Sequence, residues 1–373
     1  AFSLGIGNIG LRQDIDWFLG SAHTLRLGWE VKSLDIFDRL QLDTTRLLDI
    51  SSRPFYSGIY TSDKWRLTPA LGVELGLRGE YFSSGRYLRL APRLGAKYLL
   101  PSDLALKAGY GHFYQYLSIP YPRDEMMMKL PVSMLQQYLP ADSAYQPIQA
   151  IHYTLGAEKW LSNELSTSLE AYYKTLSNVL ETDMPLALPF LGESIAFRSG
   201  SGWAAGIELL VKWKTSYLGY ALGWTRRTFD STSFYPVFDS RHNLNLAWGI
   251  PLGRGWTVSL QWLLRTGFPY TGVIGRYQEV PLDGEYGCFP WAYINGRRGD
   301  TRYPPYHRLD LAIEKTIRLL RANWTAYFQV VNVYAQKNVL FYNYYEDSDG
   351  RIKREAVTML PWPIPGFGLR GSF

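Results

Sequence analysis

Apolar and polar residues alternate with a period of two along most of this chain, and residues 68–82 show the alternation most clearly. One set in this segment is apolar: Leu71, Val73, Leu75, Leu77 and Tyr81. The intervening set is small or charged and includes Glu74, Arg78 and Glu80. Successive side chains of an extended strand point to opposite faces, so the two sets lie on opposite faces of one strand. An Arg at the middle of a bilayer would cost about 2–4 kcal/mol, so the charged face must meet water.

The same alternation recurs and predicts about fifteen strands. They are expected near residues 10–19, 23–33, 55–66, 69–83, 87–99, 104–116, 149–160, 165–178, 203–213, 216–228, 241–250, 256–266, 306–318, 323–345 and 364–373. Each approaches or exceeds the roughly 9–11 residues that a tilted strand needs to cross a membrane. A sheet can span lipid only when it closes, because an open edge leaves backbone groups unpaired. The expected fold class is therefore all-β, a transmembrane antiparallel outer-membrane β-barrel.

Short and long connections between these strands alternate along the chain. The short ones are tight turns at residues 20–21, 101–103, 162–164 and 214–215, and the long ones lie near 34–54, 117–148, 179–202, 229–240 and 267–305. In outer-membrane barrels the short turns are periplasmic and the long loops extracellular. Six tryptophans lie within a few residues of a short turn: Trp17, Trp65, Trp160, Trp213, Trp256 and Trp324. Tryptophan favours a membrane interface, which supports this orientation.

The composition agrees with strands that have one face in lipid and one face in water, rather than with membrane-spanning helices. The chain is 46% hydrophobic and 16% aromatic, yet its mean hydropathy of -0.17 is mildly polar. No run approaches the roughly 18–20 uninterrupted apolar residues of a membrane helix. The net charge of +6 is spread along strands, which argues against a nucleic-acid partner. The expected localisation is the bacterial outer membrane, with outer-membrane lipid as a partner.

Motifs for enzymatic, metal or cofactor chemistry are weak, and we expect no enzyme activity, no cofactor and no metal site. Residues 5–10 have the spacing of a dinucleotide-binding loop, but an alternating strand follows where a helix is needed. Residues 347–350 begin like a calcium loop and continue with Arg351 and Lys353, which favours a polar turn. The single Cys288 forms no internal disulfide, and the histidines lack ligand spacing: His23, His112, His152, His242 and His307.

Ligand contacts are expected in the long loops, because binding groups concentrate on loops held by a rigid scaffold. The 267–305 loop is the richest, and its candidate ligand-binding residues are Tyr270, Arg276, Tyr286, Trp291, Tyr293, Arg297, Arg298 and Asp300. Aromatic rings offer stacking faces and Arg binds anions in a bidentate manner. For any one of these residues, a solvated or self-packed loop position is an equally good interpretation. The 117–148 loop is a candidate lid and contributes Tyr121, Arg123, Met126, Met127 and Met128.

Several strings together resemble the C-terminal barrel portion of a TonB-dependent outer-membrane receptor over essentially the whole chain. They are HTLRLGWE from His23, YTSDKWRLTPALGVELGLRGEYFS from Tyr60, FDSRHNLNL from Phe238, YPPYHRLDLAIEK from Tyr303, VVNVYAQKN from Val330 and the ending GLRGSF. The resemblance implies a roughly 22-stranded barrel filled by an N-terminal plug. It also implies import of a scarce nutrient with energy from a TonB-type protein that engages the plug.

The resemblance and the strand count lead to the same expectation about the missing parts. Complete single-chain bacterial barrels have an even number of strands, whereas about fifteen are expected here. We expect residues 1–373 to form one outer-membrane β-barrel domain, the C-terminal portion, with the plug and the first strands upstream or in a second polypeptide.

Three classes of function remain open at this point. The first is an outer-membrane receptor and transporter barrel for TonB-dependent uptake of a siderophore, cobalamin, oligosaccharide or peptide. The second is a structural or scaffolding barrel subunit of a larger complex. The third is a passive porin-like channel. The loop composition does not choose among the ligands.

The last strand yields a testable prediction. By the resemblance, the barrel assembly machinery reads a terminal aromatic strand, and Phe367, Leu369 and Phe373 are the candidate signal. A simple lipid-facing strand end is the compatible alternative. Deletion of Phe373 should lower the amount of assembled protein in outer membranes, measured by surface labelling. An unchanged surface amount would contradict the assembly role.

Overall fold

The computed structural model describes residues 2–42, 45–119, 121–122, 138–183, 196–278, 291–319, 321–359 and 361–372, almost all in strands and turns. Fifteen long strands lie at the positions of the expected ones, one of which also covers a second, separate strand. They are β1 (Phe2–Leu19), β2 (His23–Leu42), β4 (Phe55–Arg66), β5 (Leu71–Phe82), β6 (Tyr87–Leu99), β7 (Leu104–Gln115), β11 (Ile148–Trp160), β12 (Leu165–Asp183), β13 (Ala196–Trp213), β14 (Ser216–Phe229), β16 (His242–Gly253), β17 (Trp256–Arg265), β22 (Tyr306–Leu319), β23 (Ala322–Val331) and β26 (Ile364–Ser372).

Shorter elements occupy the long connections. They are β3 (Thr45–Ser52), a 3-10 turn at Ser84–Arg86, β8 (Leu117–Ser118), β9 (Tyr121–Pro122), β10 (Leu139–Pro140), β15 (Thr232–Phe234), β18 (Pro269–Tyr270), β19 (Val273–Gln278), β20 (Trp291–Asn295), β21 (Thr301–Arg302), β24 (Asn338–Glu346) and β25 (Ile352–Met359). No helix among the described residues is long and apolar enough to cross a membrane.

One expected strand proved to be two. The alternation predicted a single strand over 323–345, but the structure ends β23 at Val331 and begins β24 at Asn338. Asn332 causes the break: it has φ +59°, its Oδ1 accepts the Gln336 N–H at 3.0 Å, and its Nδ2 donates to the Gln336 carbonyl at 3.1 Å. Asn tolerates this left-handed conformation well. The expected loop at 34–54 was also wrong in part, because β2 extends to Leu42 and pairs with β3.

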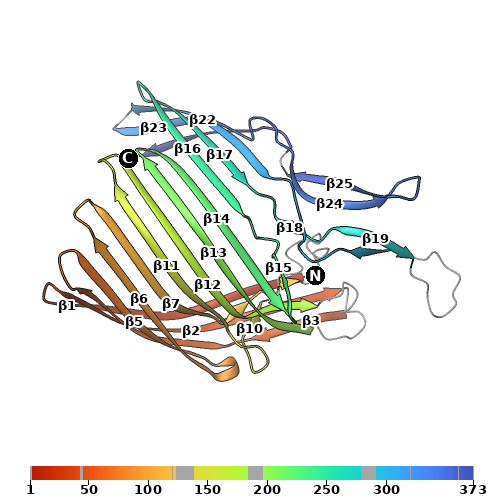
Figure 1. Ribbon diagram of the computed structural model, residues 1–373, viewed down its shortest axis with the longest axis horizontal. Coiled ribbons are helices and arrows are strands. Elements are labelled where there is room, and N and C mark those ends of the chain that lie inside the picture. Colours follow the sequence, from red (N-terminus) through yellow and green to blue (C-terminus); the bar gives the residue numbers. More distant parts are fainter. Residues whose placement is uncertain are drawn as a thin grey trace. The chain divides into compact units, whose positions relative to one another are not determined.

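The described residues divide into two compact units. The first unit contains residues 1–157, 171–205 and 226–233. Its strands β1, β2, β4, β5, β6 and β7 pair antiparallel with their neighbours in the chain. Figure 1 shows them in red to yellow. The register places Trp17 opposite Leu25, and Trp65 opposite His23 and Val73.

The second unit contains residues 158–170, 206–225 and 234–373. Strands β14, β16, β17, β22, β23 and β26 form a second antiparallel series, in green to blue in Figure 1. The hairpin of β24 and β25 pairs within itself and belongs to a separate two-stranded sheet. The pairing of β19 with β20 likewise forms its own hairpin.

The two faces of the strands differ as the sequence predicts. On one face large apolar side chains are open, with Ile9 82%, Leu88 71% and Ile59 70% exposed. A water-soluble protein rarely leaves such a continuous apolar surface uncovered. The intervening positions hold charged and small residues such as Arg78 and Glu80. This is the arrangement of a lipid-facing surface backed by a polar wall.

Aromatic side chains form two bands on the apolar face of the first unit. Trp17 and Trp65 lie beside short turns and are 58% and 39% exposed. About 20 Å further along the strands, at ~3.3 Å per residue and a tilt near 40°, a second row crosses four strands. Its members are Tyr110, Tyr153, Tyr173 and Trp203, with successive ring centroids 5.2, 6.4 and 6.4 Å apart. Two bands at this separation match the girdles that flank a hydrocarbon layer.

The terminal strand β26 pairs with β23 and points its apolar residues outward. Phe367 is 86% and Leu369 66% exposed, and they lie opposite Phe328 and Ala326. Phe373 lies outside the described residues. The assembly role of these three residues therefore stays a prediction.

The assignment of the two faces can be tested on β5. Leu77 lies near the middle of this strand on the apolar face and is 47% exposed. Leu77→Arg should lower the free energy of unfolding in lipid by about 2–4 kcal/mol, because a guanidinium at that depth lacks water. Guanidinium titration of protein refolded into phospholipid vesicles measures the change.

Gly76→Ser is the matched control on the polar face of β5. A Cβ at Gly76 would lie 3.4 Å from its nearest neighbour, the Ser62 Cβ, so the substitution fits with little adjustment. Its effect should stay within about 0.5 kcal/mol. Equal losses for the two variants would contradict the assignment of faces.

Candidate functional site

A tyrosine-rich cleft lies among the loop hairpins of the second unit. It encloses about 440 Å³ and is lined by Tyr270, Gly272, Val273, Ile274, Thr301, Tyr344, Ile352, Lys353 and Arg354. These residues come from β18 and the start of β19, from β21, and from the β24–β25 hairpin. We call this space the loop cleft.

Stacked tyrosines form the base of the loop cleft. The rings of Tyr270 and Tyr303 are nearly parallel, with centroids 4.3 Å apart and planes at 20°. Tyr342 tilts against both, at 5.7 Å from Tyr270 and 5.5 Å from Tyr303. Tyr270 is only 5% exposed, and its burial raises the pKa of its phenol. Such offset pairs are worth about 0.5–1.5 kcal/mol each beyond area burial, which stiffens the base.

Arg354 brings positive charge to the edge of this aromatic base. Its Nη1 donates to the Tyr270 hydroxyl at 3.0 Å, and its guanidinium lies over the Tyr342 ring at 4.6 Å. No described carboxylate pairs with Arg354. A guanidinium has five N–H donors, so several remain for an oxygen-rich ligand. The cleft therefore combines stacking surface with a planar anion-binding group.

The β24–β25 hairpin is held by a polar turn at its tip. Asp347 Oδ1 accepts the Asp349 N–H at 3.1 Å and the Arg351 N–H at 2.9 Å, and Gly350 takes φ +74°. Lys353 Nζ lies 2.8 Å from Asp347 Oδ2. The hydrogen bond from Lys353, followed by that from the Arg351 backbone, lowers the pKa of Asp347. The interpretation of residues 347–350 as a polar turn is confirmed.

A second group of contacts holds the other side of the cleft. Asp239 is 1% exposed, and its carboxylate bonds with Arg302 and accepts the Thr225 N–H at 2.7 Å. Arg302 Nη1 also donates to the Gly267 carbonyl at 3.0 Å. A Cβ at Gly267 would fall 1.6 Å from the Tyr303 carbonyl oxygen, so only glycine allows this approach.

Three of the sequence-predicted loop residues lie at or beside the cleft. Tyr270 forms its base. Arg276 pairs with Glu346, which raises the pKa of the guanidinium, and its Nη2 donates to the Gly350 carbonyl at 2.7 Å. The Tyr293 hydroxyl donates to the Tyr344 carbonyl at 3.2 Å. These contacts join the β19–β20 hairpin to the β24–β25 hairpin.

Each of the other predicted loop residues either lies away from the cleft or falls outside the described residues. Arg298 lies over the Phe234 ring at 3.7 Å, and Asp300 accepts the Thr301 hydroxyl at 3.0 Å. Arg297 is an exposed turn residue whose carbonyl accepts the Asp300 N–H at 3.3 Å. Trp291 begins β20 opposite Gln278. Tyr286 and Cys288 lie outside the described residues, as do Arg123, Met126, Met127 and Met128 of the candidate lid.

Sequence reasoning missed Tyr303, Tyr342, Tyr344 and Arg354. Tyr342, Tyr344 and Arg354 belong to the β24–β25 region. The alternation placed the two tyrosines in one long strand over 323–345 and left Arg354 in a connection with no expected strand. A signal was present: Tyr342, Tyr344 and Arg354 flank a DSDG turn in a tyrosine-rich segment, the pattern of an exposed hairpin.

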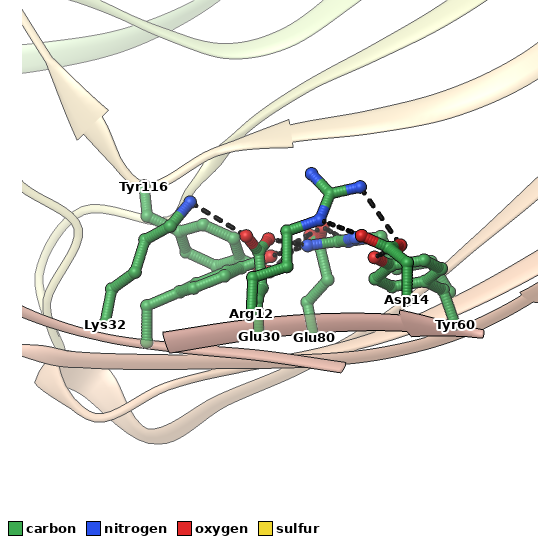
Figure 2. A network of polar contacts seen from close by, with 9 residues as sticks. Arg12, Asp14, Glu30, Lys32, Tyr60, Glu80 and Tyr116 are labelled. Atoms are coloured by element: carbon green, nitrogen blue, oxygen red, sulfur yellow. Dashed lines mark hydrogen bonds and ion pairs between the residues drawn. The ribbon is translucent and has the colours of Figure 1, made fainter. Parts of the chain in front are cut away.

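The first unit carries a different polar cluster on the wall face of β1, β2, β4 and β5, shown in Figure 2. Arg78 is its centre, pairing with Glu30 and, through Nε at 2.7 Å, with Glu80. Arg78 Nη2 also donates to the Tyr56 hydroxyl at 2.6 Å. The Tyr116 hydroxyl donates to Glu80 Oε2 at 3.1 Å. We call this set the wall network.

The wall network extends along the same face. Lys32 Nζ lies 2.9 Å from Glu30 Oε2. Arg12 Nε donates to Asp14 Oδ2 at 2.8 Å, and Tyr60 donates to the other Asp14 oxygen. Nearly every charge here has an opposite partner, so the network stabilises a polar wall and offers little free charge to a ligand. The described residues contain no cluster of three or more metal-ligating side chains.

Several strings that carry the family resemblance have structural roles. In the string from Tyr303, Asp310 Oδ1 accepts the Asn332 N–H at 2.9 Å. Asn338 binds His307 through two hydrogen bonds, at 3.0 and 2.9 Å. These side chains fix the ends of β22, β23 and β24.

Similarity to solved structures covers nearly the whole chain. The siderophore receptor PirA from Pseudomonas aeruginosa matches with a TM-score of 0.61 and 14% identity over 90% of this chain and 55% of that one. The ferripyoverdine receptor of the Pseudomonas aeruginosa outer membrane matches with a TM-score of 0.62 and 15% identity over 99% and 48%. The outer membrane transporter YddB from Escherichia coli matches with a TM-score of 0.62 and 9% identity over 98% and 53%.

The chain spans about half the length of these structures. No curated protein sequence matches it significantly. The family model described as TonB dependent receptor-like, beta-barrel, matches residues 4–333. The two-faced strands, the aromatic bands and the polar wall are those of an outer-membrane barrel, and this chain belongs to the TonB-dependent receptor-like β-barrel family.

Proposed function

We propose that this chain is the larger barrel part of a ligand-gated outer-membrane importer whose plug lies upstream or on a separate polypeptide. The loop cleft carries the proposal, because it combines a rigid aromatic base with a guanidinium that no described carboxylate neutralises. In this proposal the long loops capture a nutrient, and a TonB-type energising protein acts through the plug. The barrel assembly machinery would insert the chain.

The cleft favours an anionic ligand over a neutral one. Arg354 contributes a positive charge that no described carboxylate neutralises, and the lining residues include no carboxylate. Three structures similar to this chain are those of a siderophore receptor, a ferripyoverdine receptor and a ferric citrate transporter. Ferric chelates with free carboxylate or catecholate oxygens are the first ligands to test, ahead of neutral oligosaccharides.

Growth on single iron sources tests this function. A strain that lacks the gene is complemented with the full-length gene and supplied with a panel of ferric chelates as the only iron. At least one chelate should support growth only when both the gene and the TonB-type protein are present.

Arg354→Ala should weaken capture of that chelate by about 10–100-fold, since a hydrogen bond to a charged group contributes roughly 1.5–3 kcal/mol. Arg351→Ala removes the same charge from the tip of the same hairpin and should leave capture unchanged. Equal growth on every source with and without the gene would contradict a role in ferric-chelate import.

Two other functions give different results with the same material. A passive pore should show steady conductance in planar bilayers, whereas a plugged receptor should be nearly silent. A scaffolding barrel should copurify with stoichiometric partners and support no uptake.

A further inference from the structure

One lysine of the second unit lies on the lipid-facing side of its strand. In β22 the residues Leu311, Ile313 and Ile317 belong to the apolar series, and Lys315 falls in the same series. Ile313 and Ile317, its neighbours on that face, are both exposed. A charge at a lipid-facing position is costly unless it finds a partner, so such a residue indicates a function.

The Lys315 side chain is held at the short turn between β16 and β17. Register places Lys315 directly opposite Trp256, the first residue of β17. Its ammonium lies over the Trp256 ring, 5.0 Å from the centroid, and donates a hydrogen bond to the Arg254 carbonyl. The charge therefore reaches the membrane boundary, where the short turns and the tryptophans lie.

The turn itself supplies a second cation, Arg254. The residues Gly253, Arg254 and Gly255 have φ of +82°, +51° and +80°. The Gly255 carbonyl accepts the Thr316 N–H at 2.8 Å. A Cβ at Gly255 would fall 2.2 Å from the Thr316 carbonyl oxygen, so only glycine lets the turn lie this close to β22. Arg254 is thereby fixed next to Lys315, with its side chain exposed.

Neither cation is neutralised within the described part of the chain. Lys315 and Arg254 form no ion pair with a carboxylate there, and the Arg254 guanidinium donates to no described residue. Lys315 retains two N–H donors and Arg254 five. Lys214 provides a contrast at another short turn. It lies over the Trp213 ring at 5.5 Å in the same way, but its Nζ is 3.2 Å from Glu164 Oε2.

The surroundings of the two cations indicate the chemistry of their partner. The lipid-facing series continues from them with two apolar cross-strand pairs, Val258 with Ile313 and Leu260 with Leu311. A fitting ligand carries an anion at one end and hydrocarbon at the other. A phospholipid has both, because its phosphate oxygens accept from a guanidinium and an ammonium while its acyl chains cover apolar side chains. Two cations repel the ammonium of a zwitterionic headgroup, which favours an anionic lipid.

We propose that Arg254 and Lys315 form a binding site for the phosphate of an anionic phospholipid, phosphatidylglycerol, in the leaflet at the short turns. The phosphate accepts hydrogen bonds from both side chains, and the Trp256 ring supports the Lys315 ammonium. The acyl chains lie along Ile313 and Leu311. The site does not depend on what the barrel transports, so its test is separate from that of the importer.

Native mass spectrometry tests the site on the full-length gene product, purified in detergent and stripped of lipid. Titration with dioleoyl phosphatidylglycerol should give one adduct at a lower lipid concentration than titration with dioleoyl phosphatidylethanolamine. Arg254→Asn, which suits a positive φ, or Lys315→Gln should weaken phosphatidylglycerol binding about fivefold, and the two together about 30-fold, since each removes one cation at a membrane surface. Binding of phosphatidylethanolamine should stay the same.

Lys214→Gln is the matched control. It removes a cation that also lies over a tryptophan but already pairs with Glu164, so phosphatidylglycerol binding should not change. Lys315→Arg keeps the charge and should keep the preference between the two lipids. If the variants that remove charge fail to fold, the unmodified protein decides, because equal affinity for the two lipids overturns the proposal.

Two further results would also overturn it. An equal loss of binding in Lys214→Gln would mean that the lipid responds to the net charge of the protein and not to this pair of residues. Displacement of the lipid by millimolar inorganic phosphate would assign the two cations to a free anion and not to a lipid headgroup.

Discussion

The structure depends on one constraint, the absence of water from the hydrocarbon of a bilayer. Backbone groups there must pair within the protein, which leaves closed sheets as the only strand-built solution. A strand of such a sheet meets lipid and a wet interior on opposite faces, so its sequence must alternate. The exposed Leu88 and Ile59 and the intervening Arg78 and Glu80 are direct consequences. The same constraint explains the aromatic bands, because tryptophan and tyrosine suit the two boundaries of the apolar layer.

The polar wall solves a second problem, that of placing many charges on one face. In the wall network Arg78 lies between Glu30 and Glu80, Lys32 pairs with the other Glu30 oxygen, and the Tyr116 hydroxyl donates to the other Glu80 oxygen. Loss of one member of such a group costs more than the pair contributes, because it leaves the partner charge unpaired.

Most of the fold could be predicted from the sequence because alternation is a local signal. Fifteen strand positions, the outward Phe367 and Leu369, and the polar turn at residues 347–350 followed from spacing alone. The break at Asn332 did not, because one residue with positive φ leaves the alternation around it intact. The extension of β2 past residue 33 was missed because polar residues there match a loop as well as a wet strand. The loop cleft was half predicted: Tyr270 and Arg276 lay in the segment chosen by composition. Arg354 was missed because it reaches the cleft only through the packing of the β24–β25 hairpin against residues much earlier in the chain, such as Tyr270.

The central claim is that side chains of one strand meet lipid and water in turn. Spin labels on single cysteines placed at each position from Leu88 to Leu94 of β6 test it most directly, by collision with oxygen in lipid and with a nickel chelate in water. The account predicts that oxygen accessibility peaks at positions 88, 90, 92 and 94, and that nickel accessibility peaks at 89, 91 and 93. Uniform accessibility to the nickel chelate along the strand would contradict it, since both faces would then lie in water.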